Sequence, residues 1–240
     1  MKKVAAIILT FDLVVGVLLV SLCVSGRTLG LWEKQLNAVQ VGNGEVLYTA
    51  EERMQDSKKI ALTFDDGPHP YYTEQLLDGL RERNVKVTFF VTGEHAGLHP
   101  DIIKRIYEEG HLIGNHTYSH IQLNSQNREE FKNQLIQTNA VLEEITGEEV
   151  EYVRPPYGTW DKTLEKELNM FPVLWTIDPR DWCSDNVACI TQSIVDKAEE
   201  NDIILMHDYY ESTVTAALAV VDELQKEGYV FVTVEEILFD

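Results

Sequence analysis

Cysteine is scarce in this chain of 240 residues, which has three: Cys23, Cys183 and Cys189. No Cys-x-x-Cys pair occurs, so a zinc site built from thiolates is not indicated. Cys183 and Cys189 are six residues apart, and we expect a disulfide between them if this part of the chain lies in an oxidising compartment. Two buried free thiols are the alternative.

Positive charge is also scarce. The chain has 20 Lys and Arg residues against 40 Asp and Glu residues, which gives a formal net charge of -20 at pH 7. Such a surface repels nucleic-acid phosphates and anionic lipid headgroups. We therefore exclude nucleic acid as a partner, whereas a cationic partner or product is compatible with the charge. A simpler interpretation is that the acidity serves solubility.

One long apolar run, Val4–Val24, follows Lys2 and Lys3 near the N-terminus. Its 21 residues are enough to span a bilayer and exceed a usual signal-peptide core. Asp12 costs about 2.5–3.5 kcal/mol at the bilayer centre, which the many Leu, Ile and Val residues outweigh. We expect residues 1–26 to be a membrane anchor, with a cleaved, secreted form as the alternative. Either one places the rest of the chain outside the cytoplasm.

Repeats and low-complexity segments are absent. Residues 27–57 are mixed and polar, with Gly42, Asn43 and Gly44 in the middle, and we interpret them as a linker or stalk with one short helix or hairpin. From residue 58 to residue 240, short apolar runs alternate with amphipathic stretches, which predicts one folded domain.

Seven apolar runs in this domain predict β-strands: Lys59–Phe64, Lys86–Val91, Leu112–Gly114, Tyr152–Val153, Val173–Thr176, Ile203–Met206 and Val230–Thr233. Strands that alternate with helices are typical of a parallel α/β sheet. The number of strands approaches that of a (β/α) barrel, but about 180 residues is short for an eightfold one. We therefore predict a smaller, distorted (β/α) barrel of about seven parallel strands.

Seven stretches predict helices: Tyr72–Arg83, Pro100–Glu109, Arg128–Thr146, Thr163–Leu168, Ala188–Glu199, Val214–Lys226 and Val234–Phe239. Asn127 precedes Glu130 by three residues, which predicts a capping box at the start of the third helix. Gly110 and Gly228 are placed to end two of the others.

Two adjacent carboxylates, Asp65 and Asp66, directly follow the apolar run Ile60–Phe64, and Gly67 and Pro68 then indicate a turn. A strand that ends in this way places its carboxylates at the carboxyl end of an α/β sheet, where ligands bind. Taken alone, the four residues fit a polar turn better. Four more polar clusters downstream, which suit the same site, favour a functional interpretation.

His116 and His120 are four residues apart, so one helical turn would point both imidazoles in the same direction. Two neutral imidazoles and one carboxylate make a three-ligand zinc site that leaves positions for water and substrate. Taken alone, the pair fits surface or capping residues better, but the aspartate pair strengthens the metal interpretation. Mg²⁺ is the alternative ion, and the histidines argue against it because Mg²⁺ prefers oxygen ligands.

Three more clusters supply candidate catalytic groups. Arg154 is placed to hold a carboxylate base, although a surface arginine before a Pro-Pro turn is the simpler interpretation. His207 ends an apolar run, where it is either a proton donor or a hydrogen-bonded core histidine. Asp178 is a candidate partner that would raise the pKa of His207. Trp182 either walls a sugar-sized site or packs in the core.

The stretches TFDDGP, HTYSH, RPPYG, DPRDW and ILMHD, which lie between Lys59 and Asp208, resemble the five motifs of the polysaccharide deacetylases, the NodB-like carbohydrate esterase family 4. They occur in the order found in the family, and no motif residue is missing. The resemblance implies a distorted β/α barrel. It also implies metal-dependent removal of acetyl groups from sugars, with Zn²⁺ as the metal and Co²⁺ as an alternative.

The resemblance also implies a role for each catalytic residue. Asp65 would be the general base, and Arg154 would orient it. His207 would be the general acid, tuned by Asp178. The remaining motif residues would bind metal or substrate. Asp66, His116 and His120 would be the metal ligands. The backbone N–H of Tyr157 would hold the oxyanion, and Trp182 and Leu205 would line the pocket for the acetyl methyl group.

These expectations describe an extracytoplasmic, membrane-anchored hydrolase that removes N-acetyl groups from N-acetylglucosamine units of peptidoglycan or a related cell-surface glycan. Acetylxylan O-deacetylation and muramic acid deacetylation are alternative activities. A membrane-tethered glycan-binding protein without turnover is the alternative of another class, against which the intact Asp65 and His207 argue.

Overall fold

The computed structural model describes residues 39–41, 45–47 and 58–239, in two compact units, Met1–Asp56 and Ser57–Asp240. In the first unit, β1 (Val39–Val41) pairs with β2 (Glu45–Leu47) in antiparallel register, which is one of the two forms predicted for residues 27–57. The predicted anchor or signal segment, residues 1–26, lies outside the described residues. Within those residues, no helix has the length and apolarity needed to cross a membrane.

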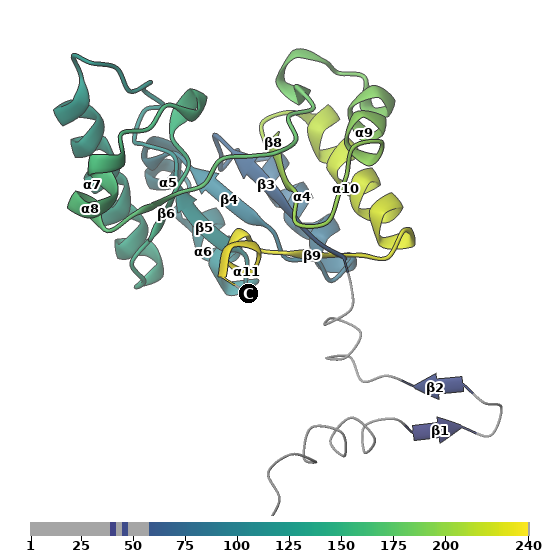
Figure 1. Cartoon of the computed structure of the whole chain (residues 1–240). Coiled ribbons are helices and arrows are strands. Elements are labelled where there is room, and N and C mark those ends of the chain that lie inside the picture. The colour runs from purple at the N-terminus through teal and green to yellow at the C-terminus, as the bar shows by residue number, and fades with distance from the viewer. Residues whose placement is uncertain (1–38, 42–44, 48–57, 240) are drawn as a thin grey trace, which may run out of the picture. The chain divides into compact units, whose positions relative to one another are not determined.

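The second unit is built on a sheet of seven parallel strands (Figure 1). Its central strand, β3, pairs along one edge with β4, and the order continues through β5 and β6 to β7. β8 pairs with the second half of β3, and β9 pairs with the first half. The strands are β3 (Lys58–Asp65), β4 (Thr88–Val91), β5 (Leu112–Asn115), β6 (Tyr152–Val153), β7 (Phe171–Pro172), β8 (Ile203–His207) and β9 (Tyr229–Val232). The parallel α/β sheet of about seven strands is therefore confirmed.

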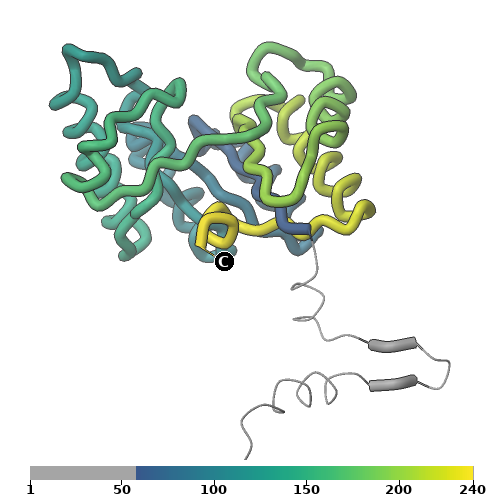
Figure 2. Tube along the Cα trace, in the orientation of Figure 1, coloured from purple at the N-terminus to yellow at the C-terminus, as the bar shows by residue number. Residues whose placement is uncertain are grey.

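The sheet forms a half-barrel, and one crossing segment connects its two sides (Figure 2). The backbone N–H of Val173 donates to Val153 of β6, whereas three residues later Thr176 donates to Ile203 at the start of β8. Ile177 then forms an isolated parallel bridge with β8. The predicted strand Val173–Thr176 is therefore wrong, because this stretch leaves one edge of the sheet and reaches the other instead of running along a single neighbour.

In Figure 1, α9 and α10 lie toward one end of the sheet and α7 and α8 toward the other, and α4 contacts both α10 and α6. The helices are α4 (Tyr72–Glu82), α5 (Gly93–Leu98), α6 (Pro100–Glu108), α7 (Arg128–Thr146), α8 (Lys162–Leu168), α9 (Val187–Val195), α10 (Glu211–Lys226) and α11 (Val234–Phe239). All seven predicted helices are present, two of them (Arg128–Thr146 and Val234–Phe239) with the predicted bounds and the other five with shifted ends. The sequence missed α5, whose six residues include two glycines.

Two of the predicted helix ends are confirmed. Gly110 and Gly228 follow α6 and α10 with φ of +78° and +87°, which suits glycine because it has no Cβ to clash. The predicted capping box is wrong. Asn127 precedes α7, but its side-chain oxygen accepts from the backbone N–H of Asn124 instead of from the helix.

The core fixes where β3 ends. Ile60, Leu62 and Phe64 of β3 are fully buried among side chains of the helices, and Ala61 is fully buried in a second cluster with Phe90. Because alternate residues of a strand point to opposite faces, apolar side chains on both faces hold β3 in the middle of the unit. The strand therefore presents its last residues at the carboxyl-terminal end of the sheet.

Candidate active site

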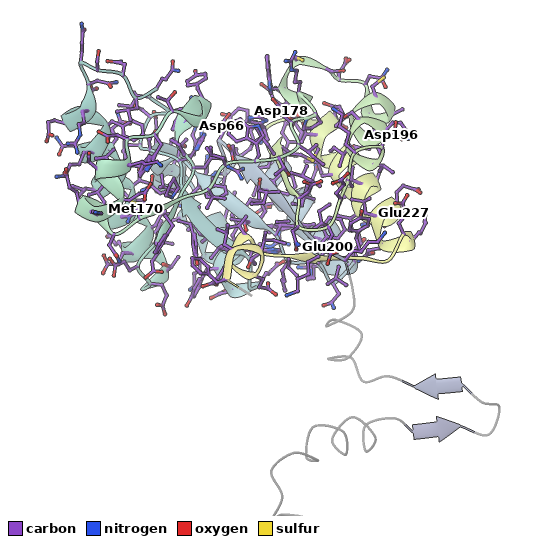
Figure 3. All side chains as sticks on the ribbon, in the orientation of Figure 1. Asp66, Met170, Asp178, Asp196, Glu200 and Glu227 are labelled. Atoms are coloured by element: carbon purple, nitrogen blue, oxygen red, sulfur yellow. The ribbon has the colours of Figure 1, made fainter. Side chains whose placement is uncertain are left out.

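Side chains from the carboxyl ends of the central strands line a cavity of about 350 Å³. Asp65 ends β3 and His207 ends β8, and the two are register partners in neighbouring strands. Figure 3 shows Asp66 and Asp178 at the same end of the unit, whereas Glu200 lies toward the other end. The lining includes nine residues that the sequence indicates: Asp65, Asp66, His116, His120, Tyr157, Asp178, Trp182, Leu205 and His207.

Arg154 is fully buried beside Asp65. Its Nη1 donates to Oδ1 of Asp65 at 2.8 Å and to the hydroxyl of Thr63 at 2.5 Å. The other guanidinium nitrogens, Nε and Nη2, donate to the carbonyls of Val173 and Leu174 at 3.2 and 3.3 Å. Because Val173 and Leu174 belong to the crossing segment, one side chain joins the end of β3 to the segment that connects the two sides of the sheet.

The ion pair leaves one oxygen of Asp65 without a bond to Arg154. Burial lowers the pKa of Arg154, and the charge of Asp65 opposes that change. The ring of Phe90 also packs on the guanidinium, with 4.2 Å between its centroid and Cζ. Oδ2 of Asp65 lies 3.8 Å from Nε2 of His116. A carboxylate that is held through one oxygen, with the other beside a cavity, is suited to accept a proton.

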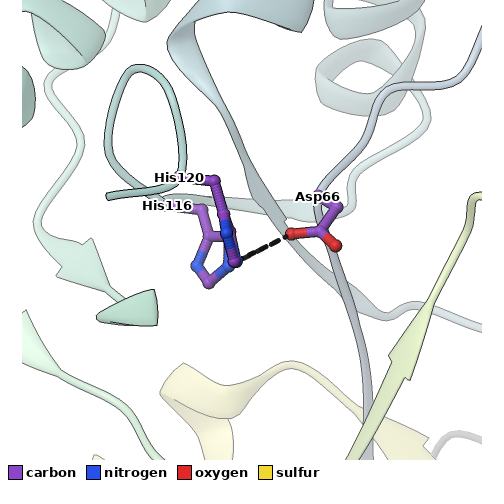
Figure 4. Close-up of side chains that lie close together, drawn as sticks. All are labelled: Asp66, His116 and His120. Carbon is purple, nitrogen blue, oxygen red and sulfur yellow. Dashed lines mark ion pairs between the residues drawn. The ribbon is translucent and has the colours of Figure 1, made fainter. Parts of the chain in front are cut away.

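Asp66, His116 and His120 bring one oxygen and two imidazole nitrogens within 4.8 Å of one another (Figure 4). Oδ1 of Asp66 lies 3.4 Å from Nε2 of His116 and 3.3 Å from Nε2 of His120. Asp66 adopts a left-handed backbone conformation with φ of +75°, which is uncommon for a residue that carries a side chain. The three residues thus form a compact set of nitrogen and oxygen donors from two loops.

The two histidines do not lie on a helical turn, so that prediction is wrong. Residues 116–120 form a loop with left-handed backbone at Thr117 (φ +63°) and at His120 (φ +56°). The ring of His116 is oriented by its Nδ1, which lies 2.7 Å from the carbonyl oxygen of Arg154. Because a carbonyl only accepts, Nδ1 carries the hydrogen and Nε2 keeps its lone pair for the cluster.

The chemistry of this cluster fits a divalent metal ion. Oδ1 of Asp66 is buried and has no hydrogen-bond partner among the described residues, a state that costs free energy unless a ligand satisfies it. Burial opposes ionisation of Asp66, but His116 and His120 outweigh it and lower the pKa of Asp66 to about 2. Burial lowers the pKa of His120, which favours the neutral imidazole that metals bind.

His207 pairs with Asp181 and not with the predicted Asp178. Nδ1 of His207 lies 2.9 Å from Oδ1 of the buried Asp181, and the backbone N–H of His207 donates to Oδ2 at 2.8 Å. Thr213 donates to the same carboxylate at 2.9 Å. Burial alone would lower the pKa of His207, but the hydrogen bond and charge of Asp181 outweigh it and raise the pKa to about 9. This environment therefore favours the protonated imidazolium of His207.

The local backbone explains why Asp181, and not Asp178, pairs with His207. Asp178 accepts at 2.8 Å from the backbone N–H of Arg180, two residues on, which is the local bond typical of aspartate in turns. Arg180 is left-handed, with φ of +56°, and a single 3-10 turn, Asp181–Cys183, follows it. This reversal directs Asp181 toward β8, while Asp178 stays in the cavity lining.

The predicted substrate residues lie around the mouth of the cavity. Tyr157 is left-handed, with φ of +59°, and its exposed ring meets His120 edge-on, with 5.2 Å between centroids. Trp182 is exposed on the opposite loop, and Leu205 is buried in β8. Cys183 and Cys189 are both free and exposed, so the structure has neither the predicted disulfide nor the alternative of two buried thiols.

Asp208 packs beneath the turn that holds Asp66. It is fully buried, accepts a hydrogen bond from the hydroxyl of Thr73, and has its pKa raised by burial to about 7. A Cβ on Gly67 would lie 2.4 Å from Oδ1 of Asp208, so no side chain fits there. The glycine after the aspartate pair therefore allows the turn to approach β8 closely.

His95 is a residue beside the site that no sequence motif indicates. Its Nδ1 lies 2.8 Å from the carbonyl oxygen of Asp66, and the backbone N–H of Thr92 donates to the carbonyl of Gly67 at 3.1 Å. The start of α5 thus holds the Asp66 turn through two hydrogen bonds. No motif marks a single histidine in an unpredicted helix, so no sequence signal was available to find it.

We predict that His95→Gln and His95→Ala lower the affinity of the metal-free protein for Co²⁺ or Zn²⁺ by about tenfold or more, whereas His95→Asn stays within about threefold. An asparagine amide can donate from near the position of Nδ1, which a glutamine amide cannot reach in the same way. Calorimetric titration measures the affinities, with the thermal midpoint as the control for folding. Equal affinities in the Asn and Ala variants would contradict the role of this hydrogen bond.

We also predict that Asp181→Asn lowers the pKa of the His207 imidazole by about 1–2 units, because a charge-assisted hydrogen bond contributes about 1.5–3 kcal/mol. Asp178→Asn is the matched control and should leave that pKa unchanged. An NMR titration of His207 in the metal-free variants gives both values. A larger shift in the Asp178 variant would show that the wrong aspartate has been assigned.

Comparison with known proteins agrees with the fold and the motifs. The sequence profile of the family described as polysaccharide deacetylase matches residues 52–173. The chain is 38% identical to the peptidoglycan-N-acetylglucosamine deacetylase PgdA of Listeria monocytogenes, over 75% of this chain and 39% of that protein. It is also 38% identical to a peptidoglycan-N-acetylglucosamine deacetylase of Bacillus cereus, over 80% of this chain and 93% of that protein.

A solved structure gives the same result. The structure is similar to that of the peptidoglycan deacetylase PdaC of Bacillus subtilis, with a TM-score of 0.73 and 37% identity over 76% of this chain and 90% of that one. The chain spans about two fifths of the length of the Listeria relative. The profile match, the Bacillus cereus relative and the shared fold together establish that this chain belongs to the polysaccharide deacetylase family.

Proposed function

We propose that this chain is a metal-dependent hydrolase that removes N-acetyl groups from N-acetylglucosamine units of a cell-surface polysaccharide, with peptidoglycan as the substrate. One observation carries the proposal. Asp65, which is suited to accept a proton, and His207, which is suited to donate one, are register partners at the ends of neighbouring strands and line the cavity that contains the metal-binding cluster.

Zn²⁺ is the ion we propose, held by Asp66, His116 and His120, with Co²⁺ as an alternative. When bound, the ion supplies Lewis-acid chemistry, because it polarises a carbonyl and lowers the pKa of water. Asp65, held by Arg154, removes a proton from the water that attacks the acetamide carbon. The backbone N–H of Tyr157 donates to the developing oxyanion, as preorganised donors do in acyl transfer.

His207 completes the reaction on the leaving group. Its imidazolium, maintained by Asp181, donates a proton to the nitrogen as the bond to the carbonyl carbon breaks. The products are acetate and an amino sugar, so one water molecule is consumed for each acetyl group. Trp182 and Leu205 contact the acetyl methyl group in this arrangement. Because His207 must be protonated, we expect activity to fall as the pH rises through its pKa.

Three features favour a bacterial envelope glycan as the substrate. The relatives include proteins named peptidoglycan-N-acetylglucosamine deacetylase and peptidoglycan-N-acetylmuramic acid deacetylase. The segment of residues 1–26, with its apolar run Val4–Val24, is suited to anchor the chain at the membrane. The catalytic domain, residues 58–240, then lies outside the cytoplasm, with residues 27–57 as its stalk. The net charge of -20 is compatible with a cationic amino-sugar product.

We expect chelation to abolish acetate release from N-acetylglucosamine oligomers and peptidoglycan, and re-addition of Zn²⁺ to restore it. Acetylxylan and a muramic acid substrate are run in parallel, and preferential release from either would identify the alternative activity. Asp65→Asn should lower the rate by at least about 100-fold while the glycan still binds. Glycan binding by the wild-type protein without acetate release from any substrate would favour a binding protein instead.

A further inference from the structure

A row of aromatic rings lies beside the catalytic cavity and has no role in the reaction proposed above. His69 stacks on Tyr72 with 4.5 Å between centroids, and Tyr209 meets His69 edge-on at 4.8 Å. Tyr209 also stacks on His95 at 5.6 Å and contacts Tyr210 at 6.2 Å. These side chains come from the loop after β3, from α4, from α5 and from the loop after β8. Tyr209 therefore contacts rings from the loop after β3 and from α5, as well as its neighbour Tyr210.

Two further cavities adjoin these rings. One, of about 270 Å³, is lined by His95, Tyr209 and Tyr210 and shares Asp66 and His120 with the catalytic cavity. The other, of about 500 Å³, is lined by Tyr72, Tyr209 and Tyr210 among others. Tyr210 lines all three cavities, so they adjoin one another at this side chain. The larger of the two further cavities falls within the range of sites that hold small ligands, about 300–1,000 Å³, and the smaller lies just below it.

The two tyrosines are available to a ligand. Tyr209 is 36% exposed and Tyr210 is 43% exposed. Within residues 58–239, neither phenol hydroxyl makes a hydrogen bond. An exposed pair of rings, fixed by neighbouring aromatic side chains and carrying free hydroxyls, offers both an apolar face and polar groups to a ligand. The apolar faces and hydroxyls of a sugar ring match both features.

Charge narrows the class of ligand. Asp185 and Glu211 line the largest of the three cavities, both are exposed, and its lining includes no Lys or Arg. The chain as a whole carries a net charge of -20. An anionic ligand such as a phosphate polymer would be repelled there, whereas a neutral saccharide would not.

We infer that Tyr209 and Tyr210 form a binding subsite for the neighbouring sugar of the same glycan chain, next to the N-acetylglucosamine unit in the catalytic cavity. This inference rests on the proposed function, because it requires a polymeric substrate. Continuity of the cavities through Tyr210, Asp66 and His120 supports it. When one sugar of the glycan occupies the catalytic cavity, the next sugar on this side contacts Tyr209. The subsite thus makes affinity depend on the length of the glycan.

The test is an equilibrium binding measurement on the full chain, loaded with Zn²⁺ and carrying Asp65→Asn so that no turnover occurs. We expect Tyr209→Ala in this background to weaken binding of the N-acetylglucosamine pentasaccharide by about 5–10-fold. Tyr209→Phe, which keeps the ring, should stay within about threefold. Binding of the N-acetylglucosamine monosaccharide should change by less than about twofold in either variant.

Tyr71→Ala is the matched control, because Tyr71 is 71% exposed and lines none of the three cavities. It should leave pentasaccharide binding within about twofold. Equal effects of Tyr71→Ala and Tyr209→Ala, or an equal loss of monosaccharide and pentasaccharide affinity in Tyr209→Ala, would overturn the subsite. Acetate release by the protein with Asp65 intact is measured separately. The proposed function therefore fails only if that release is absent, whatever the binding data show.

Discussion

The buried ion pair between Arg154 and Asp65 is the interaction on which the rest of the site depends. A guanidinium removed completely from water requires a charged partner and acceptors for its other donors. Here Asp65 supplies the charge, and Thr63, Val173 and Leu174 supply the acceptors. The backbone carbonyl oxygen of Arg154 also accepts from Nδ1 of His116, so the position of Arg154 determines which nitrogen of His116 faces the cluster. One buried residue thus links Asp65, the imidazole of His116 and the crossing segment.

Backbone geometry, more than side-chain packing, places the other groups. Asp66, His120, Tyr157 and Arg180 all have φ between +56° and +75°, in loops at the same end of the sheet. Such conformations cost about 1–3 kcal/mol each and persist only where the surroundings hold them. For Asp66 these surroundings are visible, since α5 holds the turn from one side and Asp208 packs beneath it. Three of these four residues, Asp66, His120 and Tyr157, line the same cavity.

The sequence predicted the fold well wherever the signal is local. Buried strands such as β3 and β8 are continuous apolar runs, and α7 is a long amphipathic stretch, so their positions follow from composition and period. The sequence did not predict the path of residues 173–177, which contact first β6 and then β8. No local pattern indicates that a segment changes from one neighbouring strand to another. The sequence also assigned the wrong aspartate to His207. Asp178 and Asp181 are alike in the sequence, and only the left-handed backbone at Arg180 separates their directions.

The most direct test of this account is a double-mutant cycle on the free energy of unfolding, with Arg154→Met, Asp65→Asn and the combined variant. Removing one partner of a buried pair leaves the other uncompensated, so each single change should destabilise the fold, by about 3–5 kcal/mol for Arg154→Met. We expect the combined variant to lose less than the two single losses added, by about 1.5–3 kcal/mol. Losses that add to within about 0.5 kcal/mol would show that the two residues are independent and would contradict the central place given to the pair.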